Sequence, residues 1–237
     1  MKTKIKVIGF DADDTLWVNE PFYKETEIQF CEMLSEYQPK NIVSKELFET
    51  EMMNLEIYGY GAKGFMLSLI ETALRVSDYK VSSQIIEKII ELGKKLLNNP
   101  IILLDGVLEV LDELFKREYK LIIATKGDLL DQERKLKKSG IEKYFDHVEI
   151  MSGKKETDYK KLLKNLGIKP DRFMMIGNSL KSDIAPVLNL GAYAVHIPYH
   201  TTWQHESGAS VQPNNKNFFK INRLIELIEL LNYEKNN

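Results

Sequence analysis

Two carboxylates one residue apart stand directly after a short apolar run near the N-terminus. The run 7–10 is followed by Asp11 and Asp13, and the hydroxyl of Thr15 comes two residues later. A run this short is typical of a buried strand, and an extended chain puts side chains two residues apart on the same face. Close carboxylates repel each other unless a cation or a shared proton offsets their charge. The spacing therefore predicts a metal site or acid–base chemistry, and the alternative is an Asp-rich turn that only caps the next segment.

Polar side chains also follow three later segments that are predicted to be strands. They are Thr125 and Lys126, then Lys154 and Lys155, then Asn178 and Asp183. A hydroxyl beside free backbone N–H groups at a strand-to-helix junction suits a phosphate, and a lysine suits its charge. A further carboxylate suits a hard divalent cation such as Mg²⁺. Ordinary helix caps and a solvated charge run are the alternatives at each position.

The elements that must position these residues alternate between strand and helix. Strands are predicted at 120–125, 147–151, 172–177 and 192–197, and helices at 106–118, 128–139, 158–166, 182–190 and 219–231. Such alternation predicts an α/β fold with a doubly wound, mainly parallel sheet. Because ligands bind at the carboxyl ends of parallel strands, the polar residues are expected to meet at one edge.

A helical block separates the first strand from the others. Its helices are predicted at 21–37, with Asn19 as a cap, and at 44–57, 61–76 and 82–97. A glycine-rich stretch between the second and third helices contains Tyr60 and Lys63. These side chains are candidates for reaching a substrate, and the alternative is a plain helix–helix turn.

Composition limits the classes of function. The chain has 237 residues, 43% of them apolar, and a net charge of −2. That balance argues against nucleic acid or an anionic membrane as the main partner. A single cysteine excludes an intrachain disulfide, and no apolar run approaches the ~20 residues of a membrane span. We therefore expect a cytoplasmic protein without a membrane partner.

These residues resemble the haloacid dehalogenase-like (HAD) superfamily over about residues 5–200. The resemblance is carried by the series Asp11-Ala12-Asp13-Asp14-Thr15, Thr125, Lys154 and Asn178 to Asp183. It implies a Rossmann-like catalytic core made by residues 1–16 and 100–237. It also implies that residues 17–99 form a small all-helical cap domain of type 1, inserted after the first strand.

The resemblance also implies roles for the candidate residues. Asp11 would be the nucleophile, Asp13 the general acid and base, and Lys154 the active-site lysine, with Lys155 as the alternative. Thr125, with Thr15 and Lys126, would bind the phosphoryl group. Mg²⁺ would be held by Asp11, Asp13, Asp183 and Asn178, the last standing where many relatives carry Asp.

The predicted function is Mg²⁺-dependent hydrolysis of a small phosphorylated metabolite through an aspartyl-phosphate. A phosphomutase, or a catalytically weak binding or regulatory protein, is the alternative on the same scaffold. Asp13 and Asp183 argue against dehalogenase activity. The assembly is expected to be a monomer or a homodimer.

Overall fold

A computed structural model describes residues 5–206, 211 and 215–236. The chain divides into two compact units. The first contains residues 1–20, 101–126 and 134–237, and the second contains 21–100 and 127–133. The stretch 127–133, which follows the second strand, therefore groups with the helical residues, and each unit is described by itself.

The first unit is built on a six-stranded sheet in the order β3-β2-β1-β4-β5-β6, and all of its strand pairs are parallel. The strands are β1 (Val7–Phe10), β2 (Lys120–Lys126), β3 (His147–Met151), β4 (Phe173–Gly177), β5 (Tyr193–His196) and β6 (Phe218–Lys220). The predicted α/β fold with a parallel sheet is confirmed.

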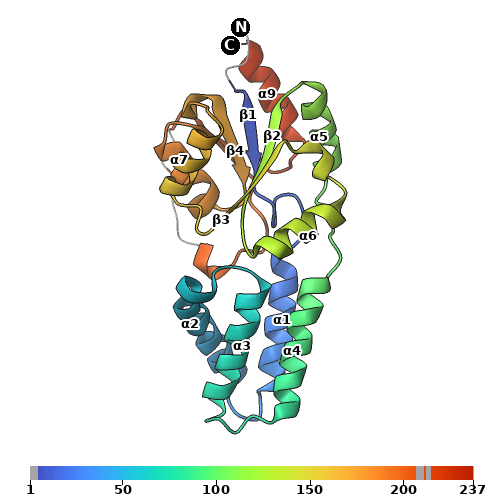
Figure 1. Cartoon of the computed structure of the whole chain (residues 1–237), viewed down its shortest axis with the longest axis vertical. Helices are drawn as coiled ribbons and strands as arrows, with labels where there is room; N and C mark the ends of the chain where they lie inside the picture. The colour runs from blue at the N-terminus through green and yellow to red at the C-terminus, as the bar shows by residue number, and fades with distance from the viewer. Residues whose placement is uncertain (1–4, 207–210, 212–214, 237) are drawn as a thin grey trace. The chain divides into compact units, whose positions relative to one another are not determined.

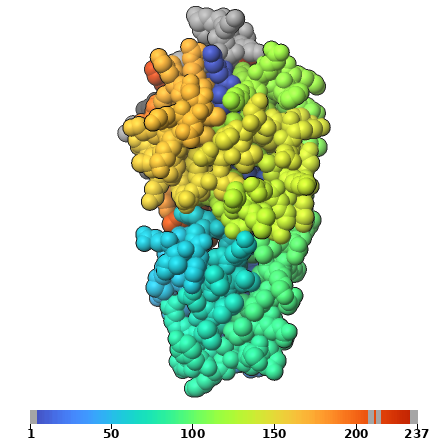
Figure 2. Space-filling view, in the orientation of Figure 1, coloured from blue at the N-terminus to red at the C-terminus, as the bar shows by residue number. Residues whose placement is uncertain are grey.

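Helices cover both faces of this sheet (Figure 1). They are α5 (Val107–Lys116), α6 (Leu129–Ser139), of which only residues 134–139 belong to this unit, α7 (Glu156–Asn165), α8 (Ala185–Asn189) and α9 (Glu226–Asn236). Alternate residues of each strand face opposite cores: Ile8 packs with α5 and α9, whereas Val7 packs with α7 and α8. Burial on both faces explains why the strands are nearly continuous apolar runs. Figure 2 shows one face of the molecule, on which residues of α6, in yellow-green, and of α7, in golden yellow, are exposed.

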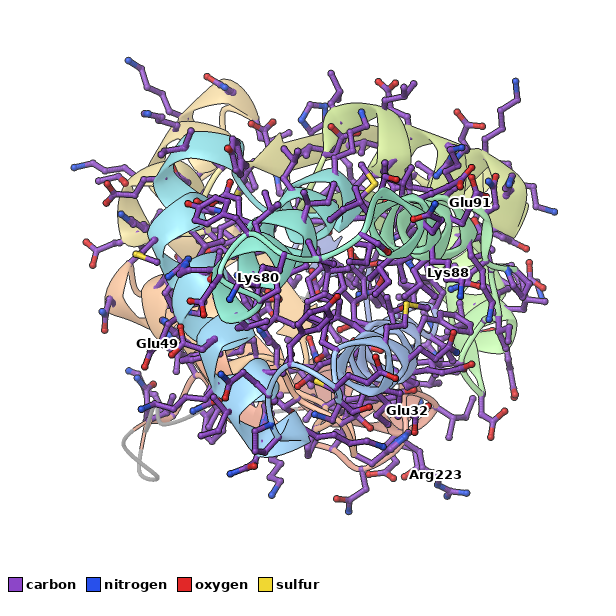
Figure 3. All side chains as sticks on the ribbon, turned by 90° about the horizontal axis from the view of Figure 1, so that it is seen from below. Glu32, Glu49, Lys80, Lys88, Glu91 and Arg223 are labelled. Atoms are coloured by element: carbon purple, nitrogen blue, oxygen red, sulfur yellow. The ribbon has the colours of Figure 1, made fainter. Side chains whose placement is uncertain are left out.

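The second unit is helical. Its helices are α1 (Glu20–Met33), which starts at the end of the first unit, α2 (Lys40–Tyr58), α3 (Ala62–Val76) and α4 (Ser83–Asn98). They share an apolar core that includes Phe30, Leu47, Leu69 and Ile89. Charged side chains lie on its exposed surface, including the labelled Glu32, Glu49, Lys80, Lys88 and Glu91 (Figure 3). This division of apolar and charged faces is what the helical spacing predicts.

Two predicted helices were partly wrong. The segment predicted as one helix over 219–231 begins as β6, whose Phe218 pairs with Ala194 of β5, and α9 starts only at Glu226. A short apolar run such as Phe218-Phe219 fits strand and helix patterns equally well. The predicted helix 182–190 is a π-helical turn, η3 (Leu180–Ile184), followed by the shorter α8.

The chain turns immediately after β1. The carbonyl of Ala12 accepts the N–H groups of Thr15, Leu16 and Trp17, and Asp14 has a φ of 59°. The Asp14 carboxylate accepts the N–H groups of Asn19 and Glu20 at 2.8–3.1 Å. Asp14 therefore caps the start of α1, a role predicted for Asn19.

None of the helices that the structure describes has the length and apolar character needed to cross a membrane.

Candidate active site

The register of the sheet brings the predicted residues to one edge. Phe10 at the end of β1 lies opposite Ile123 of β2 and Ile176 of β4. The residues that follow these strands therefore emerge side by side at the carboxyl edge, where parallel sheets bind ligands.

Asp11, Lys154 and Asp183 form a buried charge cluster at that edge. Lys154 Nζ donates to Asp11 Oδ1, and it lies 2.6 Å from Asp183 Oδ1. The other oxygen of Asp11 accepts a hydrogen bond from the Thr15 hydroxyl at 3.3 Å. One ammonium thus serves two carboxylates from different strand ends, so the cluster carries a net charge of −1 when both carboxylates are ionised.

The backbone at Lys154 supports a functional constraint. Lys154 has a φ of 52°, a left-handed conformation that costs energy for a residue with a side chain. Its side chain is buried, whereas the neighbouring Lys155 is exposed and precedes α7. The structure therefore places Lys154, and not Lys155, against Asp11.

Burial and crowding of charge alter proton affinities in the cluster. Burial, together with Asp183, raises the pKa of Asp11 to about 7, although Lys154 opposes the change. Burial alone would lower the pKa of Lys154, but Asp11 and Asp183 outweigh it and raise that pKa. The cluster therefore favours an additional cation or proton.

This pKa has a consequence for stability. Between pH 4 and 7, folded Asp11 holds a proton that the unfolded chain releases near pH 3.8. Since the folded state binds more protons, the free energy of unfolding in EDTA should fall as pH rises through this window. Urea titrations should show a shallower fall for Asp11→Asn. Some fall should remain in this variant, because burial also raises the pKa of Asp14 to about 7. Identical pH slopes for the two proteins would contradict the assignment.

Asp13 occupies a different environment from Asp11. Its carboxylate accepts hydrogen bonds from Trp17 Nε1 at 2.7 Å and from Lys135 Nζ at 3.0 and 3.2 Å. Lys135 also donates to Asn19 Oδ1 at 2.8 Å. Lys135 was not predicted from the sequence, because it stands 122 residues from Asp13 in an ordinary charged helix pattern.

Asp183 is fixed by the turn that carries it. Its Oδ2 accepts the N–H of Ser179 at 2.9 Å, and its carboxylate packs so tightly on Gly177 that a Cβ there would collide with it. Glycine at this strand end is therefore required by close approach. Asn178 Oδ1 lies 3.4 Å from the Thr15 hydroxyl that also contacts Asp11.

Thr125 and Lys126 lie at the end of β2. Thr125 is buried, and Lys126 Nζ donates to Ser182 Oγ at 2.9 Å and to the Glu206 carboxylate. Glu206 was not predicted, because no local pattern links it to a strand end. Burial lowers the pKa of Lys126, and Glu206 opposes that effect.

Tyr60 and Lys63 belong to the second unit, where Tyr60 lies in the turn between α2 and α3 and Lys63 lies in the first turn of α3. Lys63 Nζ lies 2.9 Å from Asp128 Oδ1, and residues 127–133 group with this unit. Tyr60 is partly buried. Their contribution to substrate binding stays a prediction.

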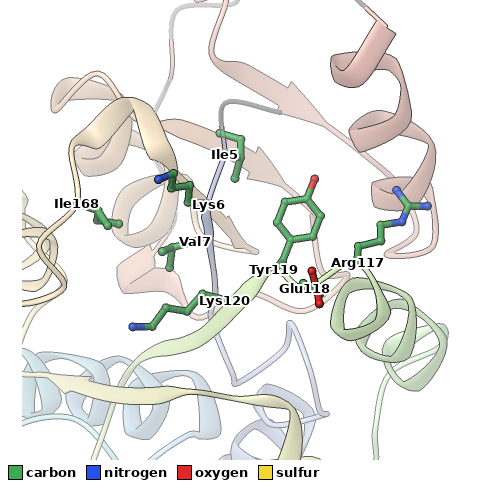
Figure 4. A pocket seen from close by; sticks show the side chains of 8 residues that line it. All are labelled: Ile5, Lys6, Val7, Arg117, Glu118, Tyr119, Lys120 and Ile168. Carbon is green, nitrogen blue, oxygen red and sulfur yellow. The ribbon is translucent and has the colours of Figure 1, made fainter. Parts of the chain in front are cut away.

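A cavity of about 440 Å³ lies at the opposite edge of the sheet, at the amino ends of β1 and β2 (Figure 4). It is lined by Ile5, Lys6, Val7, Arg117, Glu118, Tyr119, Lys120 and Ile168. None of the predicted site residues lines it, so it is separate from the charge cluster.

The donor set at the carboxyl edge fits Mg²⁺. Asp11 and Asp183 offer carboxylate oxygens, and Asn178 offers an amide oxygen beside them. Among residues 5–206, 211 and 215–236, no group of three or more His, Cys, Asp or Glu side chains is gathered for a metal. Two carboxylates with other oxygens suit Mg²⁺, which keeps several of its waters and usually takes only one or two carboxylates.

Comparison with known proteins identifies the family. A family model described as haloacid dehalogenase-like hydrolase matches residues 5–191. The chain belongs to the haloacid dehalogenase-like hydrolase family. A crystal structure of a haloacid dehalogenase-like family hydrolase from Xanthomonas campestris resembles it over 99% of this chain and 95% of that chain, with a TM-score of 0.86 and 32% identity. The predicted family is confirmed.

Curated relatives in the family are phosphatases. The mouse (Mus musculus) N-acylneuraminate-9-phosphatase is 32% identical over 112 residues, which are 45% of this chain and 42% of the relative. The pyrimidine 5'-nucleotidase PynA of Streptococcus pneumoniae is 33% identical over 113 residues, 43% of this chain and 47% of the relative. Each match thus spans less than half of the relative's length, and the two names give different substrates.

Proposed function

We propose that this protein is a phosphatase that hydrolyses a small phosphorylated metabolite with Mg²⁺ and an aspartyl-phosphate intermediate. The observation that carries the proposal is the Asp11–Lys154–Asp183 cluster at the carboxyl edge of the sheet. Family membership and the phosphatase relatives support it. In this chemistry the protein contributes mainly position and charge.

In the first step Asp11 attacks phosphorus with one carboxylate oxygen. The bond between phosphorus and the ester oxygen breaks, and the leaving oxygen takes a proton from Asp13. Lys154 neutralises charge on Asp11 and on the phosphoryl group, and the hydroxyls of Thr15 and Thr125 orient the phosphoryl oxygens. The products of this step are the free alcohol and phosphorylated Asp11.

In the second step Asp13 acts as a base. Its carboxylate takes a proton from water, whose oxygen attacks phosphorus and displaces the Asp11 carboxylate. Inorganic phosphate leaves, and both side chains regain their starting states. Trp17 and Lys135 hold the Asp13 carboxylate in place for both steps.

Mg²⁺ would be held by the side chains of Asp11, Asp183 and Asn178 and by the backbone carbonyl of Asp13. When bound, it supplies positive charge that offsets the carboxylates and polarises the phosphoryl group. This positive charge would offset the net charge of −1 that the buried cluster carries when both carboxylates are ionised.

Asn178 gives a test of the metal site. We expect Asn178→Asp to bind Mg²⁺ more tightly, by about tenfold, because the substitution adds one negative charge to the oxygen donors. Calorimetric titration of Mg²⁺ into both proteins measures the change. Equal or weaker binding by the variant would place Asn178 away from the ion.

The activity itself is tested by phosphate release. Sugar phosphates, nucleotides and p-nitrophenyl phosphate should be offered with Mg²⁺ and with EDTA. We expect turnover that depends on Mg²⁺, with one class of substrate preferred. An isomerised phosphate ester without release of phosphate would indicate a phosphomutase, and no turnover with the ion bound would indicate a binding or regulatory protein.

Substrate choice is proposed to depend on Tyr60 and Lys63, which lie in the predicted cap, residues 17–99. Lys63→Ala and Tyr60→Phe are then expected to change the order of preference within the substrate panel. A cytoplasmic location and a monomeric or homodimeric assembly stay predictions from the sequence.

A further inference from the structure

Glu206 is the centre of a second charge cluster in the first unit. Its Oε2 accepts hydrogen bonds from Ser179 Oγ at 2.5 Å and from Ser182 Oγ at 2.6 Å. Its other oxygen accepts from Lys126 Nζ, which also donates to Ser182 Oγ at 2.9 Å. These four residues, Glu206, Lys126, Ser179 and Ser182, are called the Glu206 cluster.

The carboxylate of Glu206 has charged and hydrogen-bonding partners despite its burial. Burial alone would raise the pKa of Glu206, but Lys126, Ser179 and Ser182 lower it to about 2. Both members of the ion pair are largely buried, with side chains only 14% and 13% exposed. Removing one member of such a pair leaves a buried charge without its partner, which is strongly unfavourable.

The Glu206 cluster surrounds the turn that carries Asp183. Glu206 accepts hydrogen bonds from Ser179 and Ser182 of this turn, and Ser182 directly precedes Asp183. The Ser179 hydroxyl also accepts the N–H of Ser182 at 3.0 Å, while its own N–H holds Asp183 Oδ2. Tyr159 also stabilises this turn, because its buried hydroxyl donates to the carbonyl of Ser182 at 3.1 Å.

We propose that Glu206 is a positioning residue that fixes the Asp183 turn for Mg²⁺, with Lys126 as its charge partner. This inference rests on the proposed function, because it assigns Asp183 to the ion. It gives Lys126 a role through Glu206 and Ser182 in place of direct contact with the phosphoryl group. Residues that orient metal ligands through hydrogen bonds typically change metal affinity by about 10–100-fold when mutated.

The test is Mg²⁺ affinity without substrate, measured by calorimetry on the full chain. Glu206→Gln keeps the shape but removes the charge, and we expect its Kd to rise about tenfold. Thr202→Ala, an exposed change in the same segment, should leave Kd unchanged. Leu227→Ala, a core change in α9, should lower stability without changing Kd, and so separates positioning from general weakening.

A double variant tests the pairing. Lys126→Met should also raise Kd, and Lys126→Met/Glu206→Gln should raise it by less than the product of the single effects, because the second change removes a partner already lost. If Glu206→Gln does not fold, Ser179→Ala, which removes one hydroxyl from the Glu206 cluster, should still raise Kd.

The outcomes separate this inference from the function it rests on. Wild-type protein that binds Mg²⁺, with folded Glu206→Gln binding within about twofold of it, would overturn the positioning role alone. Wild-type protein that binds no Mg²⁺ would overturn the metal site itself, and the positioning role with it.

Discussion

Asp11→Asn should reduce phosphate release by about 10⁴-fold or more, because the amide cannot replace the carboxylate as a nucleophile. The variant keeps the size of the side chain and an oxygen for the Thr15 hydroxyl. It also removes a buried charge from the crowded cluster, so we expect a folded protein that is at least as stable at neutral pH. Steady-state release of phosphate on the best substrate of the panel measures the effect.

Asp14→Asn is the matched control for that variant. Asp14 is also buried and acidic, but it caps the start of α1 by accepting backbone N–H groups. Its replacement should lower stability and leave kcat within about tenfold of the wild-type value. Equal losses of kcat in the two variants would remove the case for Asp11 as the nucleophile.

Lys154→Met should damage both chemistry and stability. The substitution leaves Asp11 and Asp183 buried without their shared cation, so the free energy of unfolding in EDTA at neutral pH should fall by about 3–5 kcal/mol. It also removes charge that stabilises the transition state, which should lower kcat by about 10²–10³-fold. Urea unfolding and phosphate release measure the two effects.

Lys155→Met is the control at the neighbouring position. Lys155 is exposed, and its substitution should change stability by no more than about 0.5 kcal/mol. The loss of stability in Lys154→Met should shrink at low pH, where Asp11 takes up a proton, or when Mg²⁺ is added. A larger loss of activity in Lys155→Met than in Lys154→Met would reverse the assignment of the lysine.

The sequence predicted those parts of the fold that depend on local pattern. The strand before Asp11 and the strand Phe173–Gly177 are apolar runs bounded by polar residues, and the structure has strands at both. The β6 strand was missed because three residues at Phe218 carry too little pattern to separate strand from helix. The π-helical turn before α8 was missed, because helical spacing does not separate it from an α-helix; its Ser182 is hydrogen-bonded to Glu206, which lies outside the segment.

The candidate site also combines residues that local pattern predicts with residues that only distant contacts bring in. The carboxylates, hydroxyls and Lys154 stand at strand ends, and topology alone brings strand ends together. Lys135 and Glu206 carry no such signal, because each reaches the site from an element whose own sequence looks ordinary. Only the packed structure places Lys135 on Asp13 and Glu206 on the turn before Asp183.

Covalent phosphorylation of Asp11 is the step on which the proposed mechanism depends, and the most direct test is to trap the phosphorylated residue. Protein turning over its best substrate with Mg²⁺ is quenched in acid, digested and examined by mass spectrometry. We predict one added phosphoryl group on the peptide that contains Asp11, and none in Asp11→Asn. With p-nitrophenyl phosphate, whose leaving group departs without a proton from Asp13, the signal should be greater in Asp13→Asn, which retains the nucleophile but lacks the base. Rapid phosphate release from wild-type protein with no phosphorylated peptide, and continued release by Asp11→Asn, would contradict the mechanism.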